Sequence, residues 1–249
     1  MLKIIWKCLA AGTLGIAFTI SASAEPTSVS FTTKDNIKIA ATLDGVIKGE
    51  RQQPVVIFIH QGGSSKEEWT GTDLWQKTLA SGMIALAYDV RGHGQSGGKA
   101  DYSTLFDDPN QAPIDLKAAL TFVKNLPTTD EKRIAIVGAS IGSNLAVMAT
   151  ALPGYGVKTA VAISGKASAV YNLAGSSVGN LPIRSIFHIA SEHEQDGLRK
   201  SWAEELYKNT IEPRRLEIVE SSHGHGVSIF QDDTSLADRI MDWLALTLQ

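Results

Sequence analysis

Short, continuous apolar runs recur along the chain, and the segments between them carry apolar residues at every third or fourth position. A continuous run predicts a strand covered on both faces, as in a parallel sheet. The spaced pattern predicts an amphipathic helix. The predicted buried strands are 55–59, 83–88, 134–137, 157–163, 184–190 and 216–219. The predicted helices are 67–81, 114–126, 145–149, 196–209 and 235–248.

Residues 29–33 and 37–43 instead alternate between apolar and polar side chains, which is typical of strands with one solvated face. Asp35 and Asn36 lie between them and predict a turn, so this segment is expected to form an antiparallel hairpin. After it, strands alternate with helices. We therefore predict an α/β fold with a mainly parallel, doubly wound sheet and an N-terminal antiparallel hairpin. Segment 97–113 is expected to be a loop, and 164–182 a loop or short helix.

The first 24 residues have the pattern of a secretory signal peptide. Lys3 and Lys7 give a positive start, the following stretch is apolar or small, and Ala22-Ser23-Ala24 suits a signal peptidase. The apolar stretch is short for a bilayer span. We therefore expect a signal peptide at 1–24 and a single domain at 25–249. The domain should be periplasmic or secreted, with no stable membrane insertion after signal removal.

Composition excludes several classes of function. The 249 residues are 43% hydrophobic and 20% charged, as in a soluble globular protein. The formal net charge of −3 and the lack of a Lys/Arg run give no sign of a nucleic-acid surface. Cys8 is the only cysteine and falls in the signal peptide, so no disulfide and no cysteine nucleophile is expected. No sequence feature implies a cofactor, and no metal is expected.

Residues 138–142 have the pattern Gly-x-Ser-x-Gly between a predicted strand and a predicted helix. A serine on such a tight turn points its hydroxyl away from its own backbone, toward a substrate. Gly138 and Gly142 would be needed because the turn crowds neighbouring segments. A five-residue pattern of this kind can arise by chance. The alternative is a glycine-rich loop in which Ser140 is a helix N-cap. Its position between strand and helix favours a nucleophile.

Polar clusters follow several other predicted strands. In open α/β sheets, ligands bind beyond the carboxyl ends of the strands, so these clusters are expected to meet. A serine nucleophile needs a histidine base, which a carboxylate orients. The clusters are His60-Gln61-Gly62-Gly63, the segment 89–96 (Asp-Val-Arg-Gly-His-Gly-Gln-Ser), the acidic segment 191–194 and the histidine-containing segment 220–226.

In this order the motifs resemble those of the alpha/beta hydrolase superfamily, from about Phe31 to Trp243. They correspond to its oxyanion turn, its turn after the fourth strand, its nucleophile elbow, its acidic loop and its histidine loop. The chain is most similar to compact, lidless members that resemble dienelactone hydrolases and small serine esterases. The resemblance implies a serine hydrolase that acts through a Ser-His-acid triad and an acyl-enzyme.

The resemblance also implies roles for individual residues. Ser140 would be the nucleophile, and the family order places the acid and then the histidine after it. His223, in a Ser-Ser-His-Gly loop, is the favoured base, with His225 as the alternative. Glu194 occupies the position of the acid. Asp196 is the alternative acid, although it could instead cap the following helix.

The oxyanion hole would be formed by the backbone amides of Gln61 and Ile141. Because only backbone would be used at residue 61, its side chain is expected to be free to vary. Other residues of these motifs would support the loops without taking part in the chemistry. They are His60, Gly62, Arg91, His93, Gly138 and Gly142.

The short segment 164–182 leaves little room for a lid, so an open site and small or extended soluble esters are expected. Trp69 and Tyr102 are candidates for lining the pocket. Three alternatives remain open. The same triad could serve a peptidase or an acyltransferase, the fold could serve a catalytically silent binding protein, or the histidine pair 223/225 with His193 and Glu194 could hold a hydrolytic metal.

Overall fold

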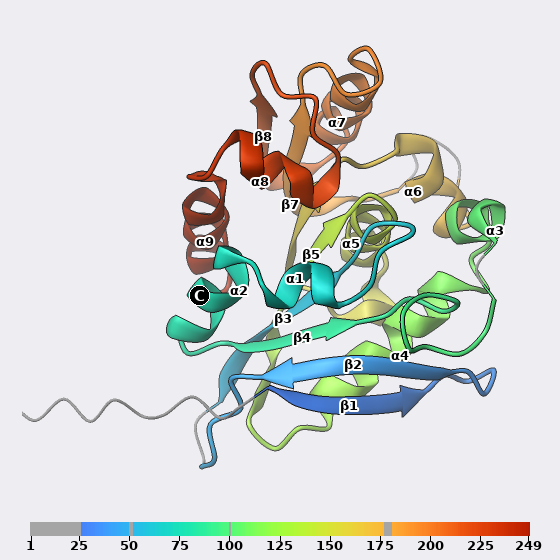
Figure 1. The fold of residues 1–249 in the computed structure, drawn as a ribbon, viewed down its shortest axis with the longest axis vertical. Coiled ribbons are helices and arrows are strands. Elements are labelled where there is room, and N and C mark those ends of the chain that lie inside the picture. Colours follow the sequence, from blue (N-terminus) through green and yellow to red (C-terminus); the bar gives the residue numbers. More distant parts are fainter. Residues whose placement is uncertain (1–25, 50–51, 100, 177–180) are drawn as a thin grey trace, which may run out of the picture.

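The computed structural model describes residues 26–49, 52–99, 101–176 and 181–249 (Figure 1). The expected signal peptide at 1–24 lies outside these ranges. The described chain is organised on an eight-stranded sheet with the strand order β1-β2-β4-β3-β5-β6-β7-β8. The strands are β1 (Thr27–Thr32), β2 (Lys38–Asp44), β3 (Gln53–Ile59), β4 (Ile84–Tyr88), β5 (Thr129–Ala139), β6 (Thr159–Ile163), β7 (Arg184–Ser191) and β8 (Ile211–Val219).

The sheet is mainly parallel, with antiparallel pairing only where β2 meets β1 and β4. The predicted α/β fold with an N-terminal hairpin is therefore confirmed. Asn36 forms the hairpin turn with a φ of 62°, a left-handed conformation that asparagine tolerates better than most residues. The Ile37 N–H donates to Thr33 Oγ1 and closes the turn.

Both faces of the sheet are covered, which explains the continuous apolar runs. Along β3, Val55, Ile57 and Ile59 pack into one core cluster, while Val56 and Phe58 pack into the other. Figure 1 shows α2 and α9 together on one side of the sheet and α4, α5 and α6 on the other. The helices are α1 (Glu67–Thr70), α2 (Asp73–Ala80), α3 (Tyr102–Asp107), α4 (Ala112–Lys124), α5 (Ile141–Ala151), α6 (Ala167–Leu173), α7 (Leu198–Lys208), α8 (Ile229–Asp232) and α9 (Leu236–Thr247).

Four predicted elements differ clearly from the structure. Strand β5 begins at Thr129, five residues before the predicted strand. The helix expected at 67–81 is two helices, because Thr72 is extended and its hydroxyl caps α2 by accepting from the Trp75 N–H. The loop expected at 97–113 contains α3, which Asp101 caps. The last strand begins at Ile211, five residues earlier than expected, with a largely exposed or half-buried edge that has no continuous apolar run.

The parallel strands point in one direction, so the segments that follow β3, β5, β6, β7 and β8 gather along one edge of the sheet. That edge holds the candidate site. Within the described ranges, no helix combines the length and apolar character needed to cross a bilayer.

Candidate active site

Ser140 lies on a strained turn between β5 and α5. Its φ of 50° and ψ of −107° are rare for a residue with a side chain. The turn is held by the Ser140 N–H, which donates to the Ile163 carbonyl at 2.8 Å. A Cβ atom on Gly138 would overlap the backbone of Gly142, and one on Gly142 would overlap the Ile59 carbonyl. Both glycines are therefore required by the close approach of backbone to backbone.

Glu194 and His225 are brought together at the ends of β7 and β8. The Nδ1 atom of His225 lies 2.5 Å from Glu194 Oε1, and the glutamate is only 5% exposed. The other carboxylate oxygen, Oε2, accepts a hydrogen bond from Ser164 Oγ at 2.8 Å. Ser164 Oγ in turn accepts from the Gly226 N–H at 3.0 Å. Glu194 is thus tied both to the His225 ring and, through Ser164, to the backbone beside it.

The loop that carries His225 passes next to the turn at Ser140. A Cβ atom added to Gly226 would lie 3.2 Å from the Cβ of Ala139, the residue before Ser140. Ser140 also pairs across the sheet with the end of β6, and Ser164 is the next residue there. Ser140, Ser164, Glu194 and His225 therefore form one cluster, assembled from the ends of four strands.

The sequence favoured His223 as the base, and the geometry favours His225 instead. His223 is exposed, and its ring faces His193 at a centroid distance of 5.0 Å. The reason lies in Ser222, which is buried and bonded to Ser191 at 2.8 Å. With Ser222 held in this way, the neighbouring His223 is exposed, and His225 is the histidine that lies against Glu194.

Asp196, the alternative acid, is exposed and has a φ of 55°. It does not take the capping position either, because Gly197 is the N-cap of α7. The residues considered as a metal-binding set are divided in the same way, with His225 on Glu194 and His223 on His193. Among the described residues, no group of three or more His, Cys, Asp or Glu is arranged to hold a metal.

A buried arginine, which belongs to no motif in the sequence, lies against Glu194. Arg199 Nε is 3.1 Å from Glu194 Oε1, and Arg199 Nη1 donates to the Ser164 carbonyl at 2.9 Å. The side chain belongs to α7, in a stretch rich in charged residues. Nothing in the local pattern distinguishes it from its exposed neighbours, so only the packing of α7 against β7 reveals it.

The turn after β3 differs from expectation at Gln61. The Gln61 N–H donates to Glu68 Oε1 at 3.2 Å, so this amide is already bonded to a carboxylate. The side chain is not free to vary, because its Oε1 is buried and occupies the space that a Cβ on Gly226 would need. Gln61 therefore packs the turn after β3 against the loop that carries His225. Burial raises the pKa of the Glu68 carboxyl.

Gly62 lies beside the first residue of α5, Ile141. A Cβ on Gly62 would lie 2.8 Å from Ile141 Cδ1 and 2.7 Å from the ring of Tyr102. In the part of the chain that the structure describes, the Gly62 N–H donates to no other group. As the first N–H of a helix, that of Ile141 has no acceptor within α5. Tyr102, on α3, covers this turn, whereas Trp69 is fully buried in the core.

His60 and His93 hold the turns in place. His60 Nε2 accepts from the Val90 N–H at 2.9 Å, so its other nitrogen, Nδ1, carries the proton and donates to the Gln61 carbonyl at 2.7 Å. Burial lowers the pKa of His60 to about 4, so the ring is neutral at pH 7. The His93 ring lies 5.0 Å from the His60 ring.

Buried ion pairs support the same loops. Arg91 Nη2 lies 2.7 Å from Asp115, which is fully buried, and Arg91 Nη1 lies 2.8 Å from Asp35. Lys66 Nζ lies 3.0 Å from Asp89, which is also buried. These pairs tie the turns after β3 and β4 to each other, to the hairpin and to α4.

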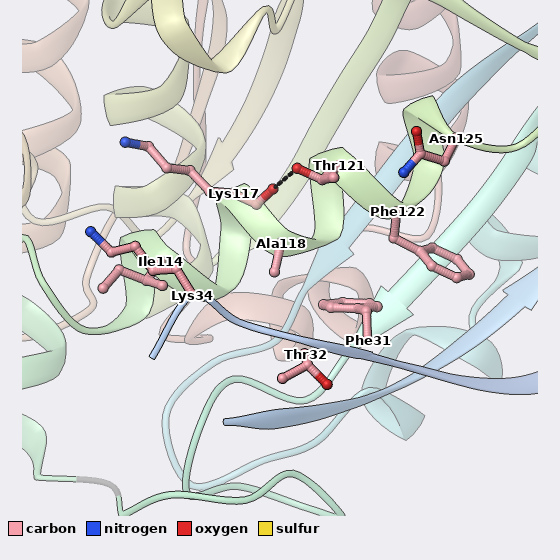
Figure 2. A pocket seen from close by; sticks show the side chains of 9 residues that line it. All are labelled: Phe31, Thr32, Lys34, Ile114, Lys117, Ala118, Thr121, Phe122 and Asn125. Atoms are coloured by element: carbon pink, nitrogen blue, oxygen red, sulfur yellow. Dashed lines mark hydrogen bonds between the residues drawn. The ribbon is translucent and has the colours of Figure 1, made fainter. Parts of the chain in front are cut away.

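The concave regions outside the candidate triad include one beside the hairpin and one beside α1. One, of about 420 Å³, is a groove between β1 and α4 with Phe31 and Phe122 along it and the ammonium groups of Lys34 and Lys117 at one end (Figure 2). The other, of about 550 Å³, lies between α1–α2 and α8–α9 and includes Glu68. Glu68 is the residue that links this second cavity to the oxyanion turn.

Comparisons with known proteins agree with this architecture. The family model for the alpha/beta hydrolase fold matches residues 54–182. The chain is 30% identical over 144 residues to the uncharacterized protein YcjY of Escherichia coli, which covers 54% of this chain and 45% of that protein. It is 30% identical over 125 residues to a thiohydrolase of Eupenicillium brefeldianum, covering 50% of this chain and 38% of that one. The chain therefore matches less than half the length of these relatives.

Solved structures extend the likeness in fold to most of the chain. The esterase Pf2001 of Pyrococcus furiosus superposes with a TM-score of 0.71 at 22% identity, covering 90% of this chain and 94% of the esterase. Acetyl xylan esterase 1 of Thermoanaerobacterium superposes with a TM-score of 0.67 at 18% identity, covering 94% and 86%.

Proposed function

The chain belongs to the alpha/beta hydrolase fold family, and we propose that it is an exported serine hydrolase that cleaves carboxylic esters. The observation that carries the proposal is the Glu194–His225 pair at 2.5 Å, next to a serine held on a strained strand-to-helix turn. A carboxylate on Nδ1 fixes the ring so that Nε2 is the basic nitrogen. That is the arrangement a serine needs to become a nucleophile.

In the proposed reaction, Ser140 Oγ attacks the ester carbonyl carbon while His225 Nε2 takes the hydroxyl proton. The tetrahedral intermediate collapses, and His225 returns the proton to the leaving alcohol. A water molecule then attacks the acyl-serine by the same route and releases the acid. Glu194 stays ionised throughout and stabilises the protonated ring between the steps.

The charge that develops on the carbonyl oxygen would be met by backbone N–H groups. The Ile141 amide is one proposed donor. For the second, the Gly62 amide is the better candidate than that of Gln61, because Gln61 already donates to Glu68. One such donor is worth roughly 10²–10³ in rate in a comparable serine hydrolase.

The proposed substrates are small or extended soluble esters. Between β6 and β7 the described chain holds only α6, a helix of seven residues, so little covers the site there. The exposed ring of Tyr102 lies over Gly62 and would contact a bound substrate. The similar proteins include an esterase and a thiohydrolase, which supports acyl compounds as the proposed substrate class. Export rests on the predicted signal peptide.

The proposal is tested by labelling the purified chain, residues 25–249, with a fluorophosphonate probe, alongside Ser140→Ala. Labelling of the wild type and not of the variant, with turnover of p-nitrophenyl esters, is the expected result. A protein that stays unlabelled while folded would instead fit a binding function.

Acyl transfer is a second candidate, because the chain is also similar in fold to the polyketide transferase GrgF from a Penicillium species, with a TM-score of 0.72 at 18% identity. It would proceed through the same acyl-enzyme, with an alcohol or amine replacing water. Adding an alcohol to the ester assay and separating the products distinguishes the two reactions. A new ester as the main product would favour transfer.

A further inference from the structure

Arg199 occupies an unusual place for a cation. It is 7% exposed, and its Nε lies 3.1 Å from the same Glu194 oxygen that pairs with His225. Its Nη1 donates to the Ser164 carbonyl at 2.9 Å. The guanidinium carbon lies 5.1 Å from the centre of the Trp202 ring. The side chain is therefore fixed on three sides, with the acid of the proposed triad as its charged partner.

Burying this arginine is costly for the fold. Burial lowers the pKa of Arg199, and the Glu194 carboxylate offsets only part of this effect. A buried ion pair is often no more stabilising than well-packed apolar residues of similar size. An apolar side chain on α7 would cover β7 without this cost. The position of the charge therefore points to a role in the site beyond packing.

We propose that Arg199 is a positioning residue of the triad, which fixes the Glu194 carboxylate and balances its charge in the resting enzyme. This inference rests on the proposed function. Ser164 holds one carboxylate oxygen of Glu194, and Arg199 shares the other with His225. Hydrogen bonds from Ser164 and His225 hold the two oxygens, and Arg199 Nε adds a charge contact without a hydrogen bond. Rotation of the carboxylate away from the ring would therefore break contacts at both oxygens.

The balance of charge follows from the groups that face one another here. Glu194, from the loop after β7, faces Arg199 of α7, His225 of the loop after β8 and the Ser164 hydroxyl after β6. The carboxylate of Glu68 on α1 also interacts electrostatically with His225. Farther out, the Lys166 ammonium lies 6.0 Å from the ring of Trp202, the ring that Arg199 also contacts.

With Arg199 present, the charge of Glu194 is balanced while His225 is neutral and ready to accept the serine proton. Without it, the carboxylate is balanced only when a proton from solvent occupies His225. A His225 that is already protonated cannot act as a base. As the solution is acidified, a variant without the arginine should therefore lose its activity at a higher pH than the wild type does.

The test compares Arg199→Met with Arg199→Lys in the purified chain, using p-nitrophenyl acetate. We expect Arg199→Met to lower kcat by about 10- to 100-fold, with KM changed by less than about twofold. The acidic limb of its rate profile should move up by about one pH unit. Arg199→Lys should keep the wild-type limb, because it keeps the charge.

A third variant separates the chemical role from folding. Methylguanidinium added to Arg199→Ala should restore kcat, whereas methylammonium at equal concentration should restore less, since it lacks the planar fork. Normal kcat and pH profile in Arg199→Met would overturn the proposal, as would a loss without any shift of the limb and without rescue. If the wild type neither labels at Ser140 nor turns over esters, the proposed function fails instead.

Discussion

The choice between His225 and His223 can be decided by one pair of variants. His225→Ala should remove the base, and His223→Ala should leave it in place. Removing the triad histidine of a serine protease lowers kcat by about 10⁶-fold, which corresponds to roughly 8 kcal/mol of transition-state stabilisation. We expect a loss of at least about 10⁴-fold for His225→Ala.

The fold should survive this change. The His225 side chain is 36% exposed, and Glu194 keeps its contacts with Ser164 and Arg199 when the ring is removed. The loss of one hydrogen bond to a charged group costs about 1–3 kcal/mol, which is less than the free energy of unfolding of a domain this size. His223→Ala removes an exposed ring that faces only His193, so kcat should stay within about twofold.

The assay is steady-state hydrolysis of p-nitrophenyl acetate at pH 8, with thermal unfolding of each variant as the control for folding. Labelling by the fluorophosphonate probe should slow in His225→Ala and not in His223→Ala, because the probe also needs an activated serine. A folded His225→Ala protein with normal turnover, beside an inactive His223→Ala protein, would refute the assignment of the base.

Three further results are expected. Ser164→Ala should lower kcat by about tenfold while the protein stays folded, because it removes the hydroxyl that holds Glu194 Oε2; esterase rates on matched amounts of folded protein check this. Arg91→Met should lower the free energy of unfolding by about 3–5 kcal/mol in urea titrations, because it leaves the buried Asp115 without its partner. Burial lowers the pKa of His188 to about 3, so this ring stays neutral in the folded chain. In the unfolded chain it takes up a proton below about pH 6.5, and the free energy of unfolding therefore falls as the pH falls. His188→Leu should therefore lose about 2.5 kcal/mol less between pH 7 and pH 4.5 than the wild type does, again in urea titrations.

Much of the fold could be predicted because its signals are local. Each central strand is a run of apolar residues long enough to cross the core, and burial on both faces follows directly from that run. The turn at Ser140 was visible for the same reason, since a tight strand-to-helix turn needs its glycines within five residues. Short elements with weak patterns, such as α3, could not be predicted, because six residues carry too little periodicity.

The sequence by itself determined the layered α/β fold, the position of Ser140 on its turn and the edge of the sheet where the polar clusters meet. Only the tertiary structure decided that His225 rather than His223 faces Glu194, because the choice depends on how Ser222 is anchored. It also decided that the Gln61 amide bonds to Glu68 and that Arg199 reaches the acid. These contacts join side chains from separate elements, and their distances depend on packing that no local pattern encodes.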